Sequence, residues 1–190
     1  MVQLNDEELR TTVNELNNYI KKHGIVKSDY PITLSNGKKS NFYFDMKKIL
    51  GNPEFHINLI AVLFKQWNKF NIKSVGGIES GSIPIAYLYA AYALTERAHI
   101  SSFYIRKKPK EHGLKKNVEG EVKSPCIIFE DVITTGQSVI SAVTRLRKEH
   151  PGLVILGISC IVDRSNNGCL DVRRYTGLEV SSMFKYDTFR

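Results

Sequence analysis

The stretch 126–138 constrains the fold of this chain more than any other part of the sequence. It begins with four apolar residues, 126–129, a run short enough to be a fully buried strand. Two carboxylates, Glu130 and Asp131, stand where that strand is expected to end. The apolar spacing after Ser138 predicts a helix that begins directly behind the turn. The stretch therefore predicts a strand–turn–helix unit with two acidic side chains at its bend.

The turn between this strand and this helix has the composition of an anion-binding site. It offers hydroxyls, a flexible glycine and a run of backbone N–H groups, from the residues Thr134, Thr135, Gly136, Gln137 and Ser138. Unpaired N–H groups and the helix dipole both favour an anion at a helix N-terminus. Carboxylates just upstream can hold the ribose hydroxyls of a sugar phosphate and help to place a divalent cation on it. An ordinary corner capped by Thr134 or Ser138 is the alternative interpretation.

Strands and helices are expected to alternate along the rest of the chain. Helices are predicted from Asn5 or Asp6 to Gly24, from 52 to 70, from 84 to 94 and from the turn to about 150, and strands at 25–33 (with loop), 41–46, 72–75, 99–105, 153–162 and 180–184. This alternation predicts an α/β fold with a central, mostly parallel sheet flanked by helices. Because ligand loops lie at the carboxyl ends of such strands, the loops at 76–82, 106–116, 130–138 and 163–168 are expected to converge on one crevice.

Composition fits one globular domain and narrows the class of partner. The chain has 190 residues, of which 42% are hydrophobic and 24% charged, with a formal net charge of +8. That charge suits nucleic acid, anionic lipid or a small anionic substrate. Its one dense cluster lies at 106–116, which favours the small substrate, and nucleic acid is not expected as a partner. Three cysteines without metal-ligand spacing predict reduced thiols in a cytoplasmic protein, and no apolar run is long enough to span a bilayer.

The stretch 126–138 resembles the signature with which type I phosphoribosyltransferases bind 5-phosphoribosyl 1-diphosphate (PRPP). The resemblance implies the type I phosphoribosyltransferase fold in a single domain over 1–190, with a small hood over about 1–50 and a PRPP-binding core over about 51–190. It further implies that Glu130 and Asp131 bind the ribose hydroxyls and that Thr134 to Ser138 bind the terminal phosphate. Mg²⁺ is the expected cofactor, held mainly by PRPP, with Glu130 or Asp131 as candidate ligands.

The basic segment 106–113, Arg-Lys-Lys-Pro-Lys-Glu-His-Gly, is similar to the flexible catalytic loop of orotate phosphoribosyltransferases. Departing diphosphate carries negative charge, which Arg106, Lys107 and Lys110 can neutralise, while His112 can hydrogen-bond or protonate a leaving oxygen. Lys110→Ala is expected to lower turnover by roughly a hundredfold. In the family this loop reaches into the neighbouring subunit's site, so the resemblance implies a homodimer. A solvated basic loop or a nucleic-acid patch is the alternative.

Two further turns, one rich in glycine and one polar, also resemble the family. The segment 77–84 resembles the family's diphosphate loop, which makes Glu79, Ser80 and Gly81 candidate substrate-binding residues. Asp163 and Arg164, followed by Gly168, match the turn whose arginine contacts the orotate carboxylate, a group that a planar guanidinium can bind through two parallel hydrogen bonds.

The segment 35–45 resembles the amino-terminal part that closes over the base. Lys38 or Lys39 is a candidate contact there, and Tyr43 or Phe44 can either stack on a pyrimidine ring or pack in the core. The segment departs from the family pattern at two positions. Ser35 stands where some relatives have a lysine, and Asn41 stands where a proline is usual.

Together these motifs predict an orotate phosphoribosyltransferase that converts orotate and PRPP to orotidine monophosphate and diphosphate, a step of pyrimidine (UMP) biosynthesis. Two alternatives stay open. One is a phosphoribosyltransferase for another nucleobase, which gains slight support because Glu130 replaces the aspartate of many orotate enzymes and the Glu-Asp pair is common in relatives that act on purines. The other is a non-catalytic, PRPP-sensing regulator that binds nucleic acid through its basic surface.

Overall fold

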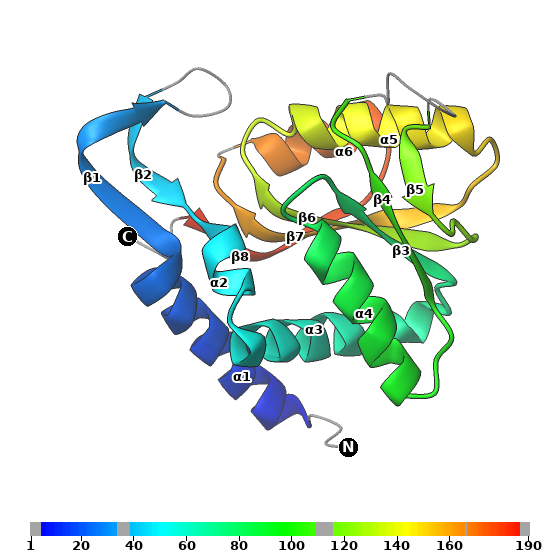
Figure 1. Ribbon diagram of the computed structural model, residues 1–190, viewed down its shortest axis with the longest axis horizontal. Helices are drawn as coiled ribbons and strands as arrows, with labels where there is room; N and C mark the ends of the chain where they lie inside the picture. The colour runs from blue at the N-terminus through cyan, green and yellow to red at the C-terminus, as the bar shows by residue number, and fades with distance from the viewer. Residues whose placement is uncertain (1–4, 34–38, 109–115, 166, 187–190) are drawn as a thin grey trace. The chain divides into compact units, whose positions relative to one another are not determined.

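The computed structural model describes residues 5–33, 39–108, 116–165 and 167–186 (Figure 1). The chain divides into two compact units, Met1–Val62 and Leu63–Arg190. Within the described residues, we find no helix whose length and hydropathy would let it cross a membrane.

The first unit consists of helices and one two-stranded sheet. Its elements are α1 (Asp6–Tyr19), a π-helical turn η1 (Ile20–Gly24), β1 (Ile25–Thr33), β2 (Lys39–Phe44), α2 (Met46–Leu50) and the start of α3 (Pro53–Trp67). As predicted, α1 begins behind Asn5, whose side chain accepts hydrogen bonds from the N–H groups of Glu7 and Glu8. The Glu8 carboxylate accepts the Asn5 N–H in return, which completes a capping box. β1 and β2 pair antiparallel.

The second unit is built on a six-stranded sheet with the order β5-β4-β3-β6-β7-β8. The strands are β3 (Ser74–Ile78), β4 (Ser101–Ile105), β5 (Val118–Gly120), β6 (Cys126–Ile133), β7 (Ile155–Asp163) and β8 (Val180–Lys185), and a short 3-10 turn, η2 (Asn68–Phe70), precedes them. Every neighbouring pair is parallel except β4 and β5. α4 (Ile83–Thr95) covers one face of the sheet, and α5 (Gln137–Glu149) and α6 (Gly168–Thr176) cover the other (Figure 1). The predicted fold class is confirmed.

Strand β6 lies at the centre of this unit and is buried on both faces. Ile128 belongs to the cluster that packs the sheet against α5 and α6, with Val143 and Leu146 of α5. Phe129, one residue further, points to the opposite face, where its ring centroid lies 5.2 Å from that of Tyr89 on α4. Each such buried side chain stabilises the fold by about 1.5–3 kcal/mol. This two-sided burial explains why the strand is a continuous apolar run in the sequence.

Three of the predicted elements differ in detail, and β5 and α6 were not predicted. β3 includes Gly76 and Gly77, which were expected in a loop. Gly76 serves close packing within the sheet, because a side chain there would overlap the ring of Phe103 on β4. β6 continues through both carboxylates to Ile133 instead of ending before them. The strand predicted over 41–46 ends at Phe44, and Met46 instead begins α2, which Asp45 caps by accepting a hydrogen bond from the Lys48 N–H at 3.1 Å.

Candidate functional site

The site lies where the order of the parallel strands changes direction. From β3 the chain passes to β4 on one side of the sheet, and it returns to β6 on the other side. Ligands of open α/β sheets bind outside the carboxyl ends of the strands at such a switch point. β3 ends in the turn 79–82, and β6 ends in the turn 134–136, which leads into α5.

One serine joins the turn after β3 to the carboxylates at the end of β6. The Ser82 hydroxyl donates a hydrogen bond to Glu130 Oε2 at 2.9 Å and accepts one from the Asp131 N–H at 2.9 Å. Gly81 lies against the second carboxylate so closely that a Cβ there would be 2.5 Å from Asp131 Cγ. Predicted substrate-binding residues of the segments 77–84 and 126–138 are therefore brought together. Ser82 itself was not predicted as a site residue, and its place in the glycine-rich segment was the only signal for it.

The two adjacent carboxylates occupy different environments. Glu130 is only 8% exposed, and burial raises its pKa well above the ordinary value; the nearby Asp131 raises it further, whereas the Ser82 hydrogen bond and Lys107 act in the opposite direction. Asp131 is half-buried, and its Oδ1 accepts a hydrogen bond from the Val132 N–H at 2.9 Å. Asp131 is thus the more accessible of the two to a ligand.

The turn after β6 forms an anion cradle at the start of α5. Gly136 is the N-cap residue, with φ +76°, and among the described residues no side chain caps this helix. The alternative in which Thr134 or Ser138 is an ordinary cap is therefore wrong. Thr135, Gln137 and Ser138 are exposed, so their hydroxyl and amide groups are accessible beside the N–H groups of the first turn. This arrangement can bind a phosphate.

The cradle packs against the segment after β7, which includes α6. A Cβ at Gly136 would lie 2.5 Å from Val172 Cγ2 and 2.9 Å from the Gly168 carbonyl oxygen, so the cradle packs directly on α6. The sequence did not predict this helix. The Arg164 N–H donates to the Ile133 carbonyl at 2.8 Å, which fixes the predicted orotate-binding residue beside the end of β6.

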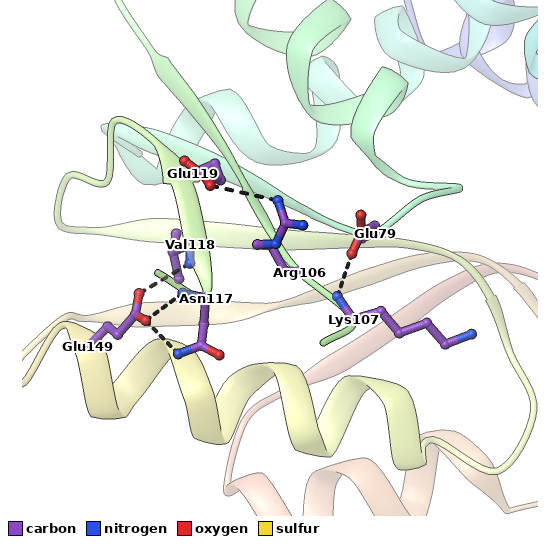
Figure 2. Close-up of polar contacts among 7 residues, drawn as sticks. All are labelled: Glu79, Arg106, Lys107, Asn117, Val118, Glu119 and Glu149. Atoms are coloured by element: carbon purple, nitrogen blue, oxygen red, sulfur yellow. Dashed lines mark hydrogen bonds and ion pairs between the residues drawn. The ribbon is translucent and has the colours of Figure 1, made fainter. Parts of the chain in front are cut away.

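The first residues of the basic loop also reach the site. The Lys107 N–H donates to Glu79 Oε2 at 2.7 Å, and Arg106 forms an ion pair with Glu119 at 3.7 Å (Figure 2). The predicted loop residues Lys110 and His112 lie outside the described residues. These contacts link the start of the loop after β4 to the turn after β3, and with the contacts above they bring together the described parts of the four predicted loops.

The predicted base-covering residues belong to the 1–62 unit. Tyr43 is 41% exposed and Phe44 is 4% exposed, so Tyr43 is the aromatic side chain accessible to a ligand. Lys39 begins β2 and is exposed, and Lys38 lies outside the described residues.

Comparison with solved structures identifies the class of protein. The orotate phosphoribosyltransferase of Mycobacterium tuberculosis H37Rv, in complex with PRPP, matches 94% of this chain and 98% of that chain with a TM-score of 0.71 at 22% identity. The doubly wound sheet, with its cradle and carboxylates at the switch point, is the type I phosphoribosyltransferase fold.

Curated relatives then show the family. The orotate phosphoribosyltransferase of Aquifex aeolicus is 35% identical over 169 residues, which cover 87% of this chain and 91% of the relative. That of Methanocaldococcus jannaschii is 37% identical over 153 residues, 80% of this chain and 82% of the relative. No family model matches the chain. The chain belongs to the orotate phosphoribosyltransferase family, and it is therefore a transferase of the glycosyltransferase class.

Proposed function

We propose that this enzyme transfers the phosphoribosyl group of PRPP to orotate, forming orotidine monophosphate and diphosphate in pyrimidine biosynthesis. The observation that carries the proposal is that Ser82 joins the turn 79–82 to the two carboxylates of β6, with an open anion cradle beside them. The names of the curated relatives and the PRPP bound to the M. tuberculosis enzyme support it.

Each part of the site has a role in this proposal. The N–H groups and hydroxyls of 134–138 hold the terminal phosphate, and Asp131, backed by the buried Glu130, accepts hydrogen bonds from the ribose hydroxyls. The turn 79–82 approaches the diphosphate with its backbone. The bond from the sugar to the base forms as the bond to diphosphate breaks, so negative charge develops on the leaving group. Arg106, Lys107 and Lys110 stabilise that charge, and His112 hydrogen-bonds a leaving oxygen.

Magnesium fits this site as an ion shared with the substrate. Among the described residues, no three histidine, cysteine, aspartate or glutamate side chains are grouped so that they could hold a metal. Mg²⁺ commonly binds one or two carboxylates together with substrate phosphates, and the half-buried Asp131 suits that role better than Glu130, whose pKa burial raises. When bound, the ion supplies positive charge beside the departing diphosphate.

The choice of orotate rests on Arg164. This residue is half-buried in the turn after β7 and is held by its N–H bond to Ile133. We assign its guanidinium to the orotate carboxylate, which it can bind through two parallel hydrogen bonds.

A homodimer is part of the proposal, with the 106–113 loop reaching the neighbouring site. α4 supports it, because its sequence contains no charged residue and its outward side chains Tyr87 and Leu94 are 43% and 58% exposed. Helices that are apolar on all sides are normally covered. Light scattering should therefore give the mass of a dimer, and Leu94→Glu should shift it toward the monomer. We also place the protein in the cytoplasm, which its three free cysteines support.

A steady-state assay with PRPP and magnesium tests the function. We expect orotate to be consumed, and hypoxanthine, guanine, adenine and uracil to remain unchanged. Turnover of another base alone would overturn the orotate assignment and keep the PRPP site. Binding of PRPP without any turnover, together with salt-sensitive binding of nucleic acid, would instead indicate the regulator.

A further inference from the structure

Both ends of the basic loop are attached to the last two turns of α5. The Glu149 carboxylate accepts three hydrogen bonds: from the Asn117 N–H at 2.6 Å, from Asn117 Nδ2 at 2.5 Å and from the Val118 N–H at 3.1 Å (Figure 2). Arg145, one turn earlier on the same helix, donates from Nη2 to the Arg106 carbonyl at 2.9 Å. Arg106 and Asn117 are also paired directly, since the Arg106 N–H donates to the Asn117 carbonyl at 2.8 Å.

Glu149 lies at the end of the helix that is unfavourable for an acidic side chain. It is the last residue of α5, where the partial negative charge of the helix end disfavours an acidic side chain. The three N–H donors offset this cost, because hydrogen bonds to an ionised acceptor are roughly twice as strong as neutral ones. The buried Oδ1 of Asn117 has no partner among the described residues, so loss of Glu149 would leave the whole side-chain amide unpaired.

We infer that Glu149 is a positioning residue for phosphoribosyl transfer, an inference that rests on the proposed function. With Arg145 it fixes the two ends of the basic loop relative to α5, and the first turn of α5 is the phosphate cradle. A helix of 13 residues spans about 20 Å and acts as a rigid spacer. Glu149 therefore sets where Lys107, which is bonded to Glu79 of the same subunit, stands relative to a phosphate bound at the other end of the helix. It also fixes the base from which the rest of the loop reaches the neighbouring site.

A second carboxylate fixes the same loop to the leaving-group side of the site. Glu79 Oε2 accepts the Lys107 N–H, so the loop is connected to the diphosphate turn as well as to α5. Because Glu79 is a candidate substrate contact and Glu149 is not, Glu149 is the residue whose replacement tests positioning alone. Misplacement of a reacting group by about 1 Å can lower the rate by about a hundredfold.

The experiment compares Glu149→Ala and Glu149→Gln with the wild type and with Glu121→Ala. Glu121 is a matched control, since its side chain is 64% exposed and its ion pair with Lys123 is equally exposed at the surface. We expect Glu149→Ala to lower kcat for orotate about ten- to hundredfold with little change in the KM for PRPP, because the cradle is untouched. Glu149→Gln keeps an oxygen acceptor for Asn117, so its kcat should lie between those of Glu149→Ala and the wild type. The control should match the wild type.

Amide hydrogen exchange provides a readout that needs no substrate. The Asn117 and Val118 amides should exchange faster in Glu149→Ala, while those of β6 stay protected. A wild-type kcat in the alanine variant, or a KM for PRPP that rises as much as kcat falls, would overturn the inference. If Glu149→Ala does not fold, the near-isosteric Glu149→Gln decides by the same two measurements. If the wild type does not turn over orotate, the proposed function fails, while unchanged exchange at Asn117 and Val118 separately shows that the anchor is absent.

Discussion

Two strand–turn–helix units of the six-stranded sheet, the first β3–α4 and the second β6–α5, are built alike but differ in what their turns contact. Each has a glycine-containing turn after a central strand, and in each the N-cap residue of the helix, Ser82 or Gly136, makes no side-chain capping bond. In the first unit Gly81 and Ser82 are buried against the carboxylates of β6. In the second, three of the five cradle residues are exposed.

This difference separates the two tasks of the site. The first turn uses its polar groups on the protein itself, so it holds Glu130 and Asp131 in place before a ligand arrives. The second turn leaves its N–H groups and hydroxyls for the ligand. Preorganised dipoles of this kind need no rearrangement during the reaction, and they are commonly the largest source of catalysis. Changes in the first turn should therefore act on kcat, and changes in the second on the affinity for PRPP.

Gly81→Ala should have the largest effect. The new Cβ would lie 2.5 Å from Asp131 Cγ, so the carboxylate must move. We expect kcat to fall roughly a hundredfold, the scale of a misplaced reacting group. Glu121→Ala, at an exposed carboxylate outside both turns, is the control. Steady-state kinetics measure both, and a Gly81→Ala enzyme that loses only PRPP affinity would contradict the division of tasks.

Gly136→Ala should act on the cradle instead. Its φ of +76° disfavours a side chain, and a Cβ would press on Val172 and Gly168. We expect the KM for PRPP to rise roughly tenfold, equivalent to about 1.4 kcal/mol, and the Tm to fall by several degrees. Gly152→Ala separates the two causes, since Gly152 has φ +82° but nothing within 4 Å. A Tm loss equal in both variants would show that backbone strain, and not contact with α6, determines the result.

The two units also show what could be predicted from the sequence. The β6–α5 unit was predicted with its cradle residues because strand, turn and helix are adjacent and each has its own local pattern. The contacts that complete the site join residues far apart: Ser82 and Glu130 are 48 positions apart, and Asn117 and Glu149 are 32 apart. Such pairs depend on strand order and register, which no local periodicity encodes.

The missed elements were short or had weak local signals. β5 has three residues and pairs antiparallel at the sheet edge, which is too short for an alternating pattern to be recognised. α6 has nine residues and follows a turn that was predicted correctly, but no side chain caps its start among the described residues. Both support the site, since β5 carries Glu119 and α6 packs under Gly136. The resemblance to a family therefore indicated the residues proposed to meet the ligand, but not the elements that hold them in place.

Glu130→Gln tests whether burial of the β6 carboxylate that Ser82 holds lowers the stability of the protein. Burial raises the pKa of Glu130, so the folded protein keeps this proton to a higher pH than the unfolded chain does. The free energy of unfolding therefore decreases as pH rises from the ordinary value of 4.5 through the raised pKa. Glutamine removes this loss, and we expect the Tm at pH 8 to increase by roughly 2–4 °C, the shift that about 1 kcal/mol causes in a domain of this size.

The same measurement at lower pH checks the cause of that increase. Below pH 4.5 the carboxyl is protonated in both states, so the Tm difference between Glu130→Gln and the wild type should disappear. Glu121→Gln, at an exposed carboxylate, should leave the Tm unchanged at both pH values. A Tm advantage that persists at low pH would point to packing instead of charge.

Thr135→Ala should have the smallest effect and tests the openness of the second unit. Thr135 is exposed, and its hydroxyl accepts only a marginal 3.5 Å hydrogen bond from the Gln137 N–H, so its loss should leave the Tm unchanged. If the hydroxyl binds the phosphate of PRPP, the KM for PRPP should rise about threefold, within the range of one neutral hydrogen bond. Thr135→Ser keeps the hydroxyl and should match the wild type. A Tm loss without a change in KM would mean that this hydroxyl serves the turn, as Ser82 does in the first unit, and the contrast between the two turns would then not extend to their side chains.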